Sequence, residues 1–123
     1  MRTIEGKIID ALNGCNGEGL KKLSCRDCVE VNGGTKKYYL WNNIIFEYNR
    51  KENAYYFSFC GYSTNTTKSR LNAIFNYFNL GGFYQKNYVV YWVNNGSIKI
   101  EVDTNKKYKI IFLDNHAVKI EEV

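Results

Sequence analysis

A single strong helical pattern, set among many short β-type runs, is the feature that most limits how this chain can fold. Four apolar residues recur at the spacings i, i+3, i+4 and i+7, so their side chains lie on one face of a helix. These residues are Leu71, Ile74, Phe75 and Phe78. Leu80-Gly81-Gly82 follows them and breaks the pattern. The sequence therefore predicts an amphipathic helix over about 67–79.

Aromatic and β-branched runs, separated by turn residues, predict strands on both sides of this helix. The predicted strands cover 36–41, 44–48, 54–60, 83–86, 88–93, 98–103, 108–113 and 118–123. Asn95-Gly96 is the strongest hairpin signal, whereas Asn42-Asn43 fits either a tight hairpin or a bulge within one strand. A second helical pattern predicts an N-terminal helix over 3–13, and a short helix could lie at 19–23.

This order of elements predicts an α+β fold with a mainly antiparallel sheet. The central helix at about 67–79 and the N-terminal helix should pack on one face of that sheet. A chain of 123 residues is long enough for one core, so we expect a single domain over 1–123. The expected core residues are Leu71, Ile74, Phe75, Phe78, Phe57, Phe59, Val90 and Ile111.

Composition bears on location and on partners. No apolar run approaches the length of a membrane-spanning helix, and MRTIEGKIID lacks the apolar stretch of a secretory signal. The formal net charge of +5 favours anionic partners, although an ordinary solvated surface rich in lysine would give the same value. The 11 tyrosines are suited to stacking or to interfaces. The sequence leaves the oligomeric state open, including a homo-oligomer.

The segment 61–72, GYSTNTTKSRLN, carries the main candidate site. A helix start attracts anions through its unpaired N–H groups, and hydroxyl groups and two cations lie beside this one. On a helical wheel Arg70 falls near Tyr77, so the two can clamp a base or an acidic group. The alternative is structural: Thr66 caps the helix while an exposed Arg70 lies over Tyr77. The candidate ligand-binding residues are Thr66, Thr67, Lys68, Arg70, Tyr77, Lys86 and Trp92.

Metal binding and catalysis have weak support in the sequence. Cys25 and Cys28 form the only closely spaced cysteine pair, and a structural zinc site normally needs two. We therefore predict no metal site, with Cys15, Cys25, Cys28 and Cys60 as weak candidates, and no cofactor. The single histidine, His116, falls in a predicted turn at 114–116. Because no hydrolase, metalloprotease or phosphate-loop motif is present, we expect the protein not to be an enzyme.

Three runs carry a resemblance to a known group of proteins: YYLWNNIIFEYN, CGYSTNTTKSRLNAIF and FYQKNYVVYWV. They resemble small proteins of bacteriophages and prophages that carry a G-[YW]-x-T-x-T-T-K-x-R-[LI]-N segment. The resemblance covers about Tyr38–Val93, departs at Asn42-Asn43, and extends neither to the first 35 residues nor beyond Asn94. It implies a phage origin and, by analogy with other small phage proteins, a role against host defence in the cytoplasm of the infected bacterium.

Three functional hypotheses follow from these observations. The first is a non-enzymatic counter-defence protein that binds an anionic ligand stoichiometrically, either a nucleotide signal or a complex loaded with nucleic acid. The second is an inhibitor that binds a host defence protein directly, for example a CRISPR effector. The third is a phage regulator that binds nucleic acid. None of the three needs a membrane.

Overall fold

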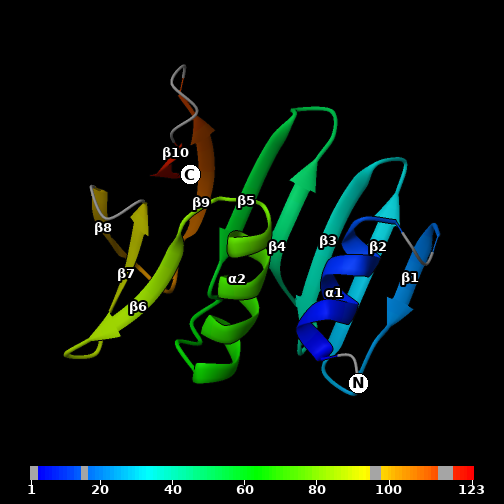
Figure 1. Ribbon diagram of the computed structural model, residues 1–123, viewed down its shortest axis with the longest axis horizontal. Helices are drawn as coiled ribbons and strands as arrows, with labels where there is room; N and C mark the ends of the chain where they lie inside the picture. The colour runs from blue at the N-terminus through cyan, green and yellow to red at the C-terminus, as the bar shows by residue number, and fades with distance from the viewer. Residues whose placement is uncertain (1–2, 15–16, 95–97, 114–117) are drawn as a thin grey trace.

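Two helices and ten strands make up the computed structural model, which describes residues 3–14, 17–94, 98–113 and 118–123 (Figure 1). The helices are α1 (Ile4–Leu12) and α2 (Asn65–Tyr77). Before α2 come β1 (Gly19–Lys22), β2 (Asp27–Asn32), β3 (Thr35–Leu40), β4 (Asn43–Asn49) and β5 (Ala54–Ser58). After α2 come β6 (Gly82–Lys86), β7 (Val89–Asn94), β8 (Ile98–Val102), β9 (Lys107–Phe112) and β10 (Val118–Glu122). The predicted α+β fold is confirmed.

Every strand pair in the structure is antiparallel. Seven strands form one sheet in the order β1-β2-β3-β4-β5-β9-β10, and β6-β7-β8 form a second, smaller sheet. Both helices lie on the same face of the large sheet, with α1 over β2 and β3 (Figure 1). The small sheet begins directly after α2 and lies beside it, and β6 packs against α2.

Aromatic rings join α2 and the two sheets into one core. Phe83 of β6 lies 5.1 Å from Phe57 of β5 and 4.8 Å from Phe75 of α2, measured between ring centroids. Phe57 and Phe75 also meet edge to face at 5.2 Å. This arrangement buries Leu71, Ile74, Phe75, Phe57, Phe59 and Val90, as predicted.

Two core predictions need correction. Ile111 is only half-buried, because strand alternation turns its side chain to the face of the large sheet that no helix covers, and Ile110 is buried instead. Phe78 is also only partly buried, since α2 ends at Tyr77 and Phe78 is its C-cap. Ile111 therefore lies on the opposite face of its strand from the one predicted, and Phe78 lies one residue beyond the end of a helix that was predicted to reach residue 79.

Other sequence expectations can be compared directly with the structure. The possible short helix at 19–23 is not formed: Gly19–Lys22 is strand β1 at the edge of the sheet, because these residues pair with β2. Asn42-Asn43 belongs to a hairpin between β3 and β4, although a bulge also lies nearby in β4. The predicted turns at Asn95-Gly96 and 114–116, with His116, fall outside the described residues.

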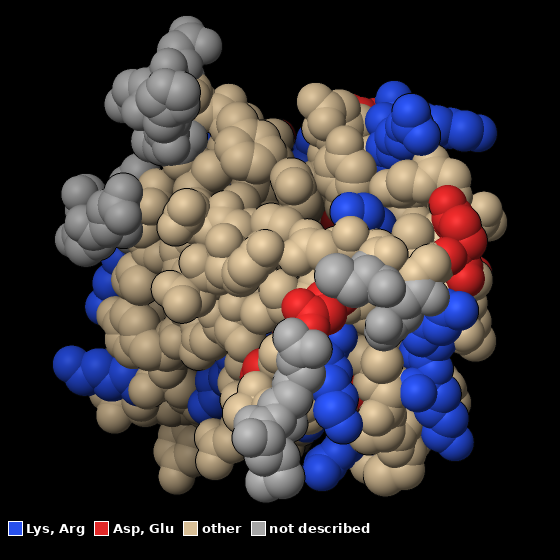
Figure 2. Space-filling model, turned by 45° about the vertical axis from the view of Figure 1, so that its right-hand side comes forward, with Lys and Arg blue, Asp and Glu red and all other residues tan. Residues whose placement is uncertain are grey.

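Charge is spread over the surface among the described residues. Figure 2 shows lysine and arginine side chains mainly on the right and lower parts of one face, with acidic side chains among them, beside a broad area without charge. On the uncovered face of the large sheet, Glu30, Lys37 and Glu47 lie opposite one another on β2, β3 and β4. Opposite charges that face each other on neighbouring strands attract, and such pairs are typical of a sheet face exposed to solvent.

Candidate functional site

The first turn of α2 is capped by Thr64 and not by Thr66. Thr64 has extended backbone angles (φ −75°, ψ 160°), and its Oγ1 accepts a hydrogen bond of 3.2 Å from the Thr67 N–H. The Thr64 and Thr67 hydroxyl groups also lie 3.0 Å apart, and Thr67 is buried. The helix therefore starts two residues earlier than predicted, and Thr66 is left half-exposed in its first turn.

Replacing Thr64 with alanine should lower the free energy of unfolding by about 1 kcal/mol, because the Thr67 N–H loses its acceptor. Replacing Thr66 with alanine should change it by less than half as much, since the Thr66 side chain caps nothing. Urea denaturation of both variants measures the difference. Equal losses in the two variants would contradict the assignment of Thr64 as the cap.

A cleft opens directly beside this helix start. It has a volume of about 330 Å³ and is lined by Leu40, Trp41, Asn43, Ile45, Tyr62, Thr64, Thr66 and Thr67. Leu40 and Ile45 are buried, whereas Trp41 and Tyr62 are 61% and 56% exposed. The cleft thus combines an apolar base, two aromatic side chains and a wall of hydroxyl groups, which is the usual composition of a small-molecule site.

Trp41 occupies an unusual backbone position. It has φ +50° and its neighbour Asn42 has φ +66°, so two residues in the left-handed region form the turn between β3 and β4. Such turns favour glycine and asparagine, and the conformation costs other residues about 1 kcal/mol or more. The Trp41 N–H donates to the Arg26 carbonyl at 2.9 Å, and the Asn43 side chain donates to the Trp41 carbonyl at 3.2 Å. These two hydrogen bonds hold the turn in this conformation.

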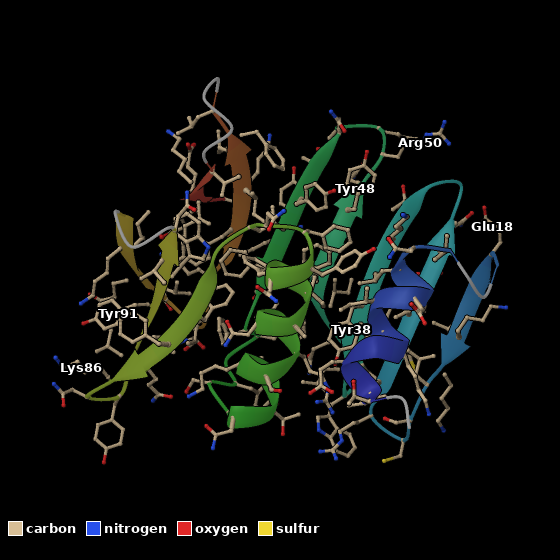
Figure 3. The ribbon with its side chains drawn as sticks, in the orientation of Figure 1. Glu18, Tyr38, Tyr48, Arg50, Lys86 and Tyr91 are labelled. Atoms are coloured by element: carbon tan, nitrogen blue, oxygen red, sulfur yellow. The ribbon has the colours of Figure 1, made fainter. Side chains whose placement is uncertain are left out.

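Arg70, expected to be exposed, is 7% exposed and belongs to a buried network. Its Nε donates to Asp27 Oδ1 at 3.0 Å, and its Nη1 lies 3.3 Å from Glu5 Oε1. Asp27 also accepts hydrogen bonds from the hydroxyl groups of Ser24 and Tyr38. The expectation of an exposed arginine over Tyr77 is wrong, because Asp27 on β2 and Glu5 on α1 take both ends of the guanidinium. Figure 3 marks Tyr38 beside α1.

The other candidate side chains do not gather at the cleft. Lys68 donates to Gln85 of β6, and Lys86 lies exposed at the far end of that strand. Tyr77 is exposed and its hydroxyl oxygen accepts a hydrogen bond of 3.0 Å from Asn13 at the end of α1. Trp92 is fully buried and donates to the Leu80 carbonyl, so its ring is not available to a ligand. Only Thr66 and Thr67 of the candidates line the cleft.

The cysteines are dispersed. Cys25 is exposed, Cys28 is half-buried, and the Cys60 thiol donates to the Ile44 carbonyl at 3.3 Å. Cys15 lies outside the described residues. Within the part of the chain that the structure describes, no three histidine, cysteine or acidic side chains are grouped to hold a metal ion.

Residues 1–120 match the family model of the Kyanoviridae Gp96 protein. The chain belongs to this family of phage proteins. The expected phage origin is therefore confirmed, and the match also spans the first 35 residues and most of those after Asn94. No match was found among curated proteins or among solved structures.

The two aromatic residues of the cleft, Trp41 and Tyr62, were not among the residues that the sequence predicted to bind a ligand. Trp41 lies directly before Asn42-Asn43, in a turn where a large apolar residue is uncommon, and Tyr62 lies inside the segment 61–72 itself. An aromatic residue at a predicted turn was the available signal for an exposed ring. No helix among the described residues is long and apolar enough to cross a membrane.

Proposed function

We propose that this phage protein acts without catalysis, by stoichiometric binding of a nucleotide-type ligand in the cleft at the start of α2. In the host cytoplasm, such binding would withhold a nucleotide signal from a defence system. The observation that carries the proposal is the meeting of two exposed aromatic rings, Trp41 and Tyr62, with the N-terminus of a 13-residue helix.

The cleft suits the two chemical parts of a nucleotide. A base can stack on the exposed ring of Trp41 or Tyr62, since every base offers a π-face. A phosphate can accept hydrogen bonds at the helix start, where the N–H groups of Asn65 and Thr66 have no partner among the described residues. Because the cations Lys68 and Arg70 are engaged elsewhere, stacking should supply most of the affinity. Binding should therefore depend only weakly on salt.

Titration calorimetry with adenosine and guanosine monophosphates and their cyclic forms tests the proposal. Tryptophan fluorescence gives a second readout, because Trp41 is exposed while Trp92 is buried and serves as an internal reference. Binding should change the emission of Trp41 only. Failure of all these nucleotides to bind at millimolar concentration would contradict the proposal.

Replacing Trp41 with asparagine should weaken nucleotide binding about tenfold, the effect of losing one base–aromatic stack. Asparagine accepts the left-handed conformation of this turn, so the free energy of unfolding should not fall. Thr66→Glu is a complementary variant. A carboxylate in the first turn favours the helix but repels a phosphate, so stability should hold while affinity falls. Thr66→Gln is its matched, uncharged control.

A second candidate function is direct binding of a host defence protein. Trp41, Tyr62 and Tyr88 are all more than half exposed, and the β3–β4 turn, the start of α2 and the β6–β7 turn lie at the same end of the molecule (Figure 1). Exposed Trp and Tyr are the residues that most often dominate protein interfaces. If nucleotides do not bind, but Trp41→Asn abolishes capture of one host protein, this second function is favoured.

A further inference from the structure

The outer face of the small sheet carries a group of aromatic and cationic side chains that the cleft does not use. Tyr84 on β6 and Tyr91 on β7 lie opposite each other, with ring centroids 5.3 Å apart and an angle of 26° between the rings. Lys99 on β8 places its Nζ 4.3 Å from the Tyr91 centroid and 5.6 Å from the Tyr84 centroid. We call Tyr84, Tyr91 and Lys99 the tyrosine face.

The core does not need these rings. Residues on the other face of the same strands, Phe83, Val90 and Trp92, are buried against α2 and the large sheet. Strand alternation therefore turns Tyr84 and Tyr91 outward, and Tyr84 is exposed. A hydrogen bond with Tyr84 raises the pKa of Lys99 above its ordinary value, although burial opposes the rise, so the ammonium remains charged beside the rings.

The hairpin turn at the end of this face extends it. Tyr88 is 96% exposed and has φ +67°, a position that favours glycine, and Asn87 before it has φ +52°. Lys86, the last residue of β6, is exposed beside this turn, and Figure 3 shows it at the tip of the hairpin with Tyr91 farther along the same sheet. One carboxylate, Glu101, lies opposite Tyr91 on β8.

We propose that the tyrosine face, with Tyr88 and Lys86, binds single-stranded nucleic acid. Exposed aromatic rings stack on bases that are not already stacked within a duplex, and neighbouring lysines neutralise phosphates. The uncovered face of the large sheet differs, since Lys37 and Lys109 there lie opposite glutamates. The tyrosine face shares no residue with the cleft, so either site can fail experimentally without the other.

Fluorescence anisotropy with a labelled ten-nucleotide thymidine DNA, at two or more salt concentrations, tests this site. Binding should weaken as salt rises, and a duplex of the same length should bind more weakly. Tyr84→Leu keeps an apolar side chain but removes the ring, so affinity should fall about tenfold. Lys99→Gln should lower affinity and reduce the slope of log K against log salt by about one.

Two further variants make the test specific. Lys109→Gln removes the same charge from the uncovered face of the large sheet, where Lys109 lies opposite Glu121, and should leave binding nearly unchanged. Glu101→Gln removes the carboxylate from the tyrosine face and should strengthen binding. Equal effects of Lys99→Gln and Lys109→Gln, equal binding of duplex and single strand, or no binding at low salt would each overturn the proposal. Trp41→Asn should not change oligonucleotide affinity, which separates this site from the cleft.

Discussion

Replacing Arg70 with methionine should lower the free energy of unfolding by about 3–5 kcal/mol, the usual effect of removing one partner from a buried ion pair. Asp27 has no exposed surface, so its carboxylate would stay buried without a counter-charge. Glu5 on α1 would lose the same partner. Urea denaturation at pH 7, followed by circular dichroism, measures the loss.

A double variant provides the control for this prediction. Asp27→Asn combined with Arg70→Met removes both charges, so the double variant should be more stable than Arg70→Met alone. The structural assignment of Arg70 would be wrong if the free energy of unfolding of Arg70→Met lay within about 1 kcal/mol of the wild-type value while its nucleotide affinity was lost. Arg70 would then contact the ligand.

The stability of the single variant Arg70→Met should depend on pH differently from that of the wild type. Burial alone would raise the pKa of Asp27, but hydrogen bonds from Arg70 and two hydroxyl groups outweigh it and hold this pKa below its ordinary value. A depressed carboxyl pKa contributes stability above the unfolded-state pKa of about 4, and that stability is lost as the pH falls through the folded-state value. Without Arg70 the pKa of Asp27 should rise. As the pH falls from 7 toward 4, the variant should therefore regain stability because its buried Asp27 becomes protonated, and the stability difference from the wild type should shrink.

Replacing Trp92 with alanine should also destabilise the protein strongly, by about 3–5 kcal/mol, because it opens a large cavity between the small sheet and α2. The indole Nε1 donates to the Leu80 carbonyl at 2.9 Å, in the segment that connects α2 to β6. Gly81 lies so close that a Cβ atom there would stand 2.8 Å from Nε1. Thermal denaturation measures the loss.

Trp92→Phe keeps most of the volume and allows a milder test. The Leu80 carbonyl loses its donor, so we expect a loss of about 1–3 kcal/mol. Nucleotide affinity of the folded variant should equal that of the wild type, because no part of the Trp92 ring reaches the surface. A variant of normal stability with a tenfold weaker affinity would restore the ligand-binding role that the sequence suggested.

Local sequence patterns predicted most of the elements. Helical spacing placed α2 and its buried residues Leu71, Ile74 and Phe75, and alternation of aromatic and polar residues placed most of the strands. These patterns work because burial of one face fixes a period of 3.6 or 2 along the chain. They failed for the first two strands of the chain, neither of which was predicted. β1 contains Gly-Leu-Lys-Lys, whose strand form depends on pairing with β2, and β2 (Asp27–Asn32) lies in a stretch rich in Gly, Asn and Cys. The cap is Thr64 and not the predicted Thr66, because several neighbouring hydroxyl residues are equally suitable as N-caps by residue type.

The sequence by itself determined the periodic faces, the basic charge and the cluster of hydroxyl groups before α2. Only the tertiary structure decided what those polar residues do. Asp27 lies 43 positions before Arg70, and Glu5 lies 65 before it, yet folding brings both to the guanidinium. The same folding brings Trp41 from a hairpin turn to the start of α2. Contacts between residues so far apart leave no periodic trace in the chain, because they depend on how whole elements pack and not on neighbours along the backbone.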